Sequence, residues 1–229
     1  MKPLRTFGRI LKRNLYLVTV MTSLFAFRWS VAEPFQIPSG SMEPTIHIGD
    51  RIVVNKSAYD VRLPFTKFVL HKVADPARGE VVVFNNPMTG ICLVKRLIGV
   101  PGDHIEIQDG FVWVNGVMIE GDGEGLRRLT EAQNEISIDE FYYTARIGDR
   151  LATLKRLPMY ARHEDLVIDI PADRYFMMGD NRDNSLDSRS WGLAKREDLK
   201  GAAKFVLYNF TLNDGFIPRI DAARSGLSL

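Results

Sequence analysis

Short runs of β-branched and apolar residues, each bounded by glycine, proline or asparagine, recur through most of this 229-residue chain. Such runs are typical of strands, because branched side chains fit a pleated sheet and the bounding residues favour turns. No alternation of strand and helix appears, which argues against a parallel sheet. We therefore expect a mainly β body of antiparallel sheets. The expected strands cover residues 50–55, 80–84, 92–98, 104–107, 111–114, 117–119, 166–170, 175–178 and 204–208.

Two local patterns refine this expectation. Asn115 and Gly116 lie between the strands expected at 111–114 and 117–119, and this pair predicts a hairpin with a type I′ turn. Residues 120–165 are more polar and less periodic than the rest. We expect them to form a smaller inserted subdomain.

The N-terminal segment differs sharply in composition from the body. The first 32 residues contain six Lys or Arg and no Asp or Glu, and residues 15–27 are uncharged and mostly apolar. A helix over 15–32 would span about 27 Å, near the roughly 30 Å of a hydrocarbon core, with Arg28 and Trp29 at the interface. We predict a basic cytoplasmic tail (1–14), a transmembrane anchor (15–32) and an extracytoplasmic domain (33–229). A cleaved signal peptide is the alternative, because Ser30-Val31-Ala32 resembles a cleavage site.

Charge and metal-binding residues exclude several functional classes. Without the six N-terminal cations, 24 basic residues face 28 acidic ones, so the body carries about −4 and offers no broad nucleic-acid surface. Cys92 is the single cysteine, which makes an intramolecular disulfide impossible. The four histidines form no short-range pair with metal-ligand spacing. We expect neither a metal nor another cofactor.

The first unusual motif is PSGSMEPT at residues 38–45. Pro38 and Gly40 favour a tight, irregular backbone around Ser39 and Ser41. A nucleophilic serine needs such a turn, because its hydroxyl must project while nearby N–H groups face the substrate oxygen. On composition alone, a plain Pro-Gly-Ser turn is the favoured interpretation.

The second motif, LVKRLIGVPGD at residues 93–103, places a lysine in an apolar strand. By alternation, Lys95 shares a face with Leu93 and Leu97. If that face is the core, the lysine points inward, which is rare and costly unless the lysine has a task. The alternative is a solvated edge strand, where Lys95 would only discourage sheet pairing.

The third motif, MMGDNRDNSLDSR at residues 177–189, is too rich in short polar side chains for a strand. It lacks the glycine and the final glutamate of a calcium-binding loop. We expect its Asp and Arg side chains to form ion pairs and turn hydrogen bonds. A purely structural polar loop is the simpler interpretation.

Together and in this order, the three motifs resemble those of bacterial type I signal peptidases, the leader peptidases, which are membrane serine proteases with a Ser/Lys dyad. The resemblance covers residues 33–60, 79–107 and 173–201. It implies that Ser41 is the nucleophile, Lys95 the general base, Ser39 a helper of the oxyanion hole and Ser185 the residue that orients the lysine. It also implies a polar scaffold of Asp180, Arg182, Asp187 and Arg189, and apolar substrate pockets of Ile37, Pro38, Met42, Ile46, Leu93 and Val94.

The chain departs from parts of the family pattern. Eukaryotic and archaeal relatives have histidine at the base position, so Lys95 places the chain on the bacterial side. Many members carry two N-terminal spans, whereas one is predicted here, and Cys92 cannot supply the cysteine pair of some Gram-negative members. The resemblance implies a single-pass protein of the bacterial inner membrane, with its catalytic domain on the periplasmic side.

The chemistry requires a neutral lysine. The ordinary lysine pKa is about 10.4, and burial can lower it to the range of about 7–8 that a general base needs. We expect Asp180 and Asp187 to pair with Arg182 and Arg189 and to stay clear of the amine, since a close anion would raise its pKa.

The expected function is removal of signal peptides from exported preproteins after small residues, through an acyl-enzyme on Ser41. The lipid bilayer is the second expected partner, contacted by Phe35 and residues 65–70. A peptidase dedicated to one substrate, such as a pilin-like protein, is the alternative within the family. A catalytically inactive binding module and a self-cleaving Ser/Lys repressor are alternatives from other classes.

Overall fold

The computed structural model describes residues 14–30, 32–63, 66, 68–119, 140–157, 165–212 and 218–229. Almost all of the predicted basic tail (1–14) lies outside these residues, as do residues 120–139 and 158–164 of the predicted insertion.

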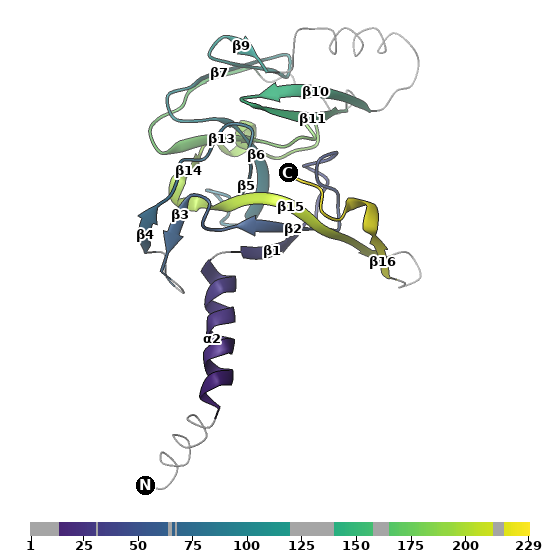
Figure 1. Ribbon diagram of the computed structural model, residues 1–229. Coiled ribbons are helices and arrows are strands. Elements are labelled where there is room, and N and C mark those ends of the chain that lie inside the picture. Colours follow the sequence, from purple (N-terminus) through teal and green to yellow (C-terminus); the bar gives the residue numbers. More distant parts are fainter. Residues whose placement is uncertain are drawn as a thin grey trace.

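The body is built on one large antiparallel sheet (Figure 1). Its strands follow the order β1 (Ala32–Gln36), β2 (Asp50–Asn55), β15 (Leu199–Leu212), β5 (Val81–Asn85), β6 (Cys92–Gly99), β13 (Arg174–Met178) and β14 (Ala194–Lys195), and β16 (Pro218–Asp221) pairs with the far end of β15. Strand β6 is therefore an interior strand, with β5 on one side and β13 on the other.

A second, four-stranded antiparallel sheet consists of β12 (Leu166–Asp169), β7 (His104–Gln108), β8 (Phe111–Val114) and β9 (Val117–Met118). Asn115 and Gly116 join β8 to β9 with positive φ angles of 53° and 77°, as the predicted type I′ turn requires. Short helical turns complete the described elements: α4 (Ser188–Trp191), η2 (Arg196–Asp198) and η3 (Ala222–Arg224).

The predicted mainly β, antiparallel fold is confirmed, but several strands of the described chain were not predicted: β1, β3 (Asp60–Arg62), β4 (Val69–Lys72), β10 (Phe141–Ile147), β11 (Arg150–Arg156), β14 and β16. Strands β10 and β11 form a hairpin within the segment expected to be an insertion. Alternate residues of β10 are buried, and they join a core cluster that includes residues of β7, β8 and β13. The alternation Phe141, Tyr143, Ala145, Ile147 was the available strand signal.

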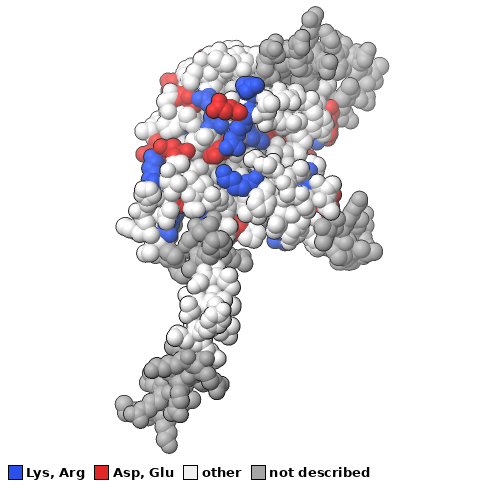
Figure 2. All heavy atoms as spheres, viewed as in Figure 1, with Lys and Arg blue, Asp and Glu red and all other residues white. Residues whose placement is uncertain are grey.

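Helix α2 (Leu15–Ser30) extends from the body like a stalk and leads into β1 (Figure 1). The helix side chains that Figure 2 does not draw in grey, those of residues 15–24, include no Lys, Arg, Asp or Glu. Among the described residues, no helix combines the length and the apolar character needed to cross a bilayer.

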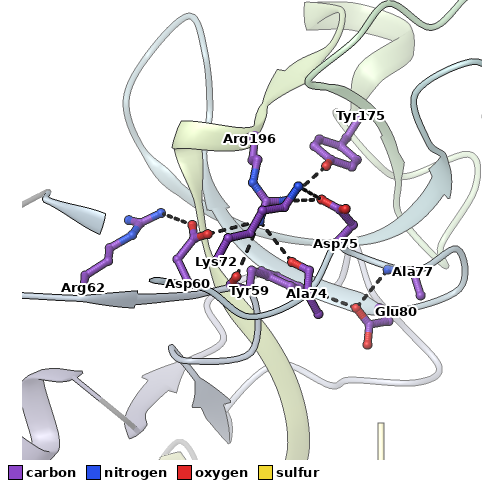
Figure 3. A network of polar contacts seen from close by, with 10 residues as sticks. All are labelled: Tyr59, Asp60, Arg62, Lys72, Ala74, Asp75, Ala77, Glu80, Tyr175 and Arg196. Carbon is purple, nitrogen blue, oxygen red and sulfur yellow. Dashed lines mark hydrogen bonds and ion pairs between the residues drawn. The ribbon is translucent and has the colours of Figure 1, made fainter. Parts of the chain in front are cut away.

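A small hairpin of β3 (Asp60–Arg62) and β4 (Val69–Lys72) projects from the end of the body where α2 is attached (Figure 1). Arg196 holds the base of this hairpin, as Figure 3 shows. Its guanidinium lies 3.1 Å from the Asp60 carboxylate and 2.7 Å from that of Asp75, and it also donates to the carbonyls of Tyr59 and Ala74.

Candidate active site

The loop between β1 and β2 carries the two serines of the first motif. Its ends are joined by backbone hydrogen bonds of 2.9 Å from Ile37 N–H to the Asp50 carbonyl and from Gly49 N–H to the Ile37 carbonyl. Ser41 is half-buried and Ser39 is exposed, and their hydroxyl oxygens lie 3.5 Å apart. These two hydrogen bonds fix both ends of the loop to each other where it leaves the sheet.

Lys95 lies in the middle of β6 and points inward. Only 3 % of the residue is exposed, and its Nζ donates a hydrogen bond of 2.5 Å to Ser41 Oγ. The inward orientation predicted from Leu93 and Leu97 is confirmed. The edge-strand alternative is wrong, because β6 has partners on both sides.

The surroundings of Lys95 favour its neutral form. Burial lowers the pKa of Lys95 from the ordinary 10.5 to about 8. The charges of Asp187 and Asp180 act in the opposite direction, and that of Arg189 adds to the lowering. With a pKa near 8, about a tenth of the amine is neutral at pH 7, whereas an ordinary lysine would be almost wholly charged.

Asp187 and Arg189 form the ion pair that the sequence predicted. Their side chains meet in two hydrogen bonds of 2.8 Å, and Asp187 also accepts the Gly179 N–H at 3.1 Å. Burial alone would raise the pKa of Asp187, but the hydrogen bonds and the charge of Arg189 lower it overall. Asp187 is therefore held as a carboxylate by a partner other than Lys95.

The predicted pairing of Asp180 with Arg182 is wrong. Asp180 binds Arg96 in a bidentate pair of 2.7 and 2.6 Å. The register of the sheet explains the difference, because β13 pairs Met178 with Arg96 and so places the residues that follow β13 beside that arginine. Arg182 is fully buried, and its backbone N–H donates to the Lys155 carbonyl on β11.

Ser185 lies next to the dyad without the expected bond to the lysine. Its hydroxyl is buried and contributes to lowering the pKa of Asp187, as a hydrogen bond to that carboxylate does. A side chain at Gly179 would overlap both the Ser185 hydroxyl and the Ser41 carbonyl. Glycine at this position therefore lets the third motif approach the serine closely.

Two residues that sequence reasoning did not single out hold the serine loop. Asn181 donates its backbone N–H to the Ser41 carbonyl at 3.2 Å and its side-chain amide to the Gly40 carbonyl at 3.1 Å. Thr45 donates its hydroxyl to Asp180 at 2.5 Å. Both residues lie inside recognisable motifs, but their roles depend on contacts between segments that the sequence does not reveal.

The residues expected to line substrate pockets are divided between core and surface. Ile37, Met42 and Ile46 are almost fully buried in one core cluster, and Val94 packs against it. The remaining two differ: Leu93 packs against the neighbouring cluster, and Pro38 is exposed. Their contact with substrate stays a prediction.

The arrangement has the parts of an acyl-transfer site. A serine hydroxyl lies within hydrogen-bond distance of a buried amine whose pKa is lowered, and two arginines neutralise the nearest carboxylates. An amine in this setting can take a proton from the hydroxyl and return it to a leaving group.

Comparison with known proteins shows the family of the chain. Residues 10–208 match the family described as signal peptidase, peptidase S26. Signal peptidase I of Pseudomonas aeruginosa is 37 % identical over 199 residues, which cover 85 % of this chain and 66 % of that protein. Signal peptidase I of Pseudomonas fluorescens is 37 % identical over 186 residues, covering 81 % and 62 %. Signal peptidase I of Aquifex aeolicus is 31 % identical over 226 residues, covering 86 % and 83 %.

The chain thus spans just under two thirds of the length of the two Pseudomonas relatives. Its match to the family extends over most of its own length and includes all three motifs. The chain belongs to the signal peptidase family, peptidase S26.

Proposed function

We propose that this protein is a serine endopeptidase that removes N-terminal signal peptides from exported preproteins, with Ser41 as nucleophile and Lys95 as general base. The observation that carries the proposal is the 2.5 Å contact between a nearly inaccessible lysine and the serine hydroxyl. A lysine placed there without a task would be an unexplained cost to the fold.

The reaction follows from the two side chains. Neutral Lys95 takes the hydroxyl proton as Ser41 Oγ attacks the scissile carbonyl carbon. The resulting ammonium gives that proton to the leaving amine as the C–N bond breaks, which leaves an ester on Ser41. Water then attacks the ester, with Lys95 accepting its proton and returning it to Ser41 Oγ. The Ser41 N–H and the Ser39 hydroxyl stabilise the oxyanion in both steps.

The polar scaffold sets the field at the amine. Arg96 and Arg189 hold Asp180 and Asp187 through bidentate contacts, and these anions otherwise favour the charged form of Lys95. We assign Arg182 a structural role in this scaffold, because it is buried and its backbone N–H donates a hydrogen bond to β11. We assign Ser185 the role of a hydrogen-bond partner for the neutral lysine in the substrate complex.

Selection of small residues beside the scissile bond is the second part of the proposal. Ile37, Pro38, Met42, Ile46, Leu93 and Val94 lie on or next to the two segments that carry the dyad. Apolar walls close to the serine leave room for alanine-sized side chains and exclude large ones.

We also propose that the enzyme works at the bacterial inner membrane, with α2 (Leu15–Ser30) in a single anchor and the catalytic domain on the periplasmic side. The anchor predicted at residues 15–32 ends too late, because Ala32 already belongs to β1. The β3–β4 hairpin supports a lipid-facing end, because Phe68 is 66 % and Leu70 55 % exposed at the end of the body where α2 is attached (Figure 1). Arg196 binds Asp60 at the base of the hairpin (Figure 3), so these apolar side chains project from a base that is tied to the body.

Substitution of each member of the dyad tests the catalytic proposal. Ser41→Ala and Lys95→Arg should each abolish cleavage of a signal-peptide precursor in reconstituted membranes, since alanine has no hydroxyl and guanidinium does not deprotonate. Cleavage is measured by the new N-terminus of the product.

Ser190→Ala and Lys204→Arg are the matched controls, because both residues are exposed. Both controls should cleave like the wild type. Full cleavage by either dyad variant would refute the assignment. A panel of unrelated precursors separates a general enzyme from a peptidase dedicated to one substrate.

A further inference from the structure

Arg224 reaches the serine loop from the C-terminal end of the described chain. It closes the short turn η3 and lies beyond residue 208, where the match to the family ends. Its side chain is 14 % exposed, although the residues on either side of it are exposed. The guanidinium is thus directed from a surface turn toward a partner inside the protein.

That partner is Asp50, the residue that ends the serine loop and begins β2. Arg224 Nη2 donates to Asp50 Oδ2 at 2.7 Å and Nε donates to Oδ1 at 2.9 Å. Asn209 and the His47 N–H each donate to the same carboxylate at 2.8 Å. Burial alone would raise the pKa of Asp50, but the hydrogen bonds from Arg224, Asn209 and His47, with the charge of Arg224, lower it overall.

The same guanidinium also binds the loop itself. Arg224 Nη2 donates to the Thr45 carbonyl at 3.2 Å. The Thr45 hydroxyl donates to Asp180, and Asn181 binds the Ser41 carbonyl from the same polar motif. The serine loop is therefore held from two directions, by the third motif on one side and by Arg224 on the other.

The backbone around Arg224 is fixed to the main sheet. Gly226 N–H donates to the Val206 carbonyl at 2.7 Å, and Leu229 N–H donates to the Lys204 carbonyl at 3.0 Å. These contacts attach the last residues to β15, the strand that also pairs with β2. Arg224 thus acts from a rigid support.

We propose that Arg224 is a positioning residue for Ser41, which ties the Thr45 carbonyl to the Asp50 carboxylate and so keeps the serine hydroxyl beside Lys95. This role rests on the proposed peptidase function. The planar guanidinium can bind both acceptors at once, whereas the ammonium of a lysine acts as a single point charge. Misplacement of a reacting group by about 1 Å can cost on the order of 100-fold in rate.

The test uses three variants of the full chain: a double variant at Asp50 and Arg224, Arg224→Lys, and Arg146→Met as a control. Arg224→Met alone would leave the Asp50 charge buried without its cation, which threatens folding. The double variant Asp50→Asn with Arg224→Met removes both charges. Asn209 and the His47 N–H donate to different oxygens of Asp50, so the single amide oxygen of asparagine keeps one of these two acceptor positions. Arg224→Lys keeps a cation beside Asp50 but loses the planar guanidinium that binds two acceptors at once. It therefore separates the effect of the charge from that of the two-point contact. Arg146→Met, an exposed arginine on β10, is the matched control.

Two measurements are made on each variant: amide hydrogen exchange across residues 37–50, and kcat and KM on a signal-peptide precursor. For the double variant we expect faster exchange in the loop, unchanged exchange in β6 and a fall in kcat of about 10- to 100-fold with KM within about threefold. Arg224→Lys should show the same pattern more weakly, and Arg146→Met should match the wild type.

Unchanged loop exchange in the double variant would overturn the proposal, as would faster exchange with wild-type kcat. Recovery of full kcat by Arg224→Lys would also overturn it, since a cation near Asp50 would then suffice. An inactive wild type would count against the peptidase function itself. The exchange measurement would still decide whether Arg224 holds the loop.

Discussion

At the scale of single residues, the burial of Lys95 carries a free-energy cost that depends on pH. The lysine pKa near 8 in the folded protein compares with 10.5 for a free lysine. Below pH 8 both states hold the proton, and the folded state carries the full penalty of about 3 kcal/mol. Between pH 8 and 10.5 the unfolded chain binds the proton that the folded protein has lost, so stability rises with pH. Above 10.5 the penalty disappears.

Comparison with Lys95→Met isolates this penalty, because methionine does not titrate and the other groups cancel. The free energy of unfolding of the wild type should rise relative to that of the variant by about 2 kcal/mol between pH 7.5 and pH 10. Urea denaturation at several pH values measures the difference. A difference that stays constant with pH would mean that the amine keeps an ordinary pKa.

At the scale of elements, the β10–β11 hairpin supports the polar motif. Lys155 on β11 donates its backbone N–H to the Asp180 carbonyl and accepts from the Arg182 N–H, both at 2.8 Å. Its side chain lies 2.7 Å from Glu140 and 3.6 Å from Glu43 of the serine loop. The hairpin therefore contacts two of the three motifs.

Two leucines of β11 provide a matched test of how the hairpin is held. Leu154 is fully buried in the core cluster shared with β7, β8 and β13, whereas Leu151 is 64 % exposed. Leu154→Ala should lower the free energy of unfolding by about 2–5 kcal/mol, and Leu151→Ala should change it by less than about 0.5 kcal/mol. Both values come from urea denaturation. Similar small losses at the two sites would show that the hairpin is loosely packed.

The elements show where sequence reasoning succeeds and where it stops. The strands around Asp50–Asn55 and Cys92–Gly99 were predictable, because their β-branched runs end at clear turn residues. The period of two placed Lys95 on the same face as Leu93 and Leu97, but it did not decide between a buried face and a solvated edge. Strands β10 and β11 were missed, because the segment was judged by its polar composition as a whole and the alternation within β10 was not read.

Pairings between distant segments lie beyond the same reasoning. The partner of Asp180 is Arg96 and not Arg182, which is decided by the register of β13 on β6. Met42 and Ile46 face the core, because their loop folds back over the sheet. Register and loop direction depend on how separate segments pack, and a local pattern does not contain that information.

At the scale of the whole molecule, the main sheet brings together residues that are far apart in the chain. Met42 and Ile46 share a buried cluster with Val81 and Val83 of β5, the strand beside β6. This packing brings the serine loop over Lys95. Strand β13 on the other side of β6 delivers the polar motif to the same place. The site is therefore a product of sheet order, and the C-terminal segment adds Arg224 from the β15 side.

The most direct test of the account is the pH dependence of kcat/KM for precursor cleavage by the wild-type chain. Because only the neutral amine can accept the serine proton, kcat/KM should rise with pH and level off with a midpoint near 8, the pKa that burial gives Lys95. A rate that is flat across pH 6–10, or one that still climbs near the pKa of an ordinary lysine, would contradict a buried, neutral Lys95 as the base.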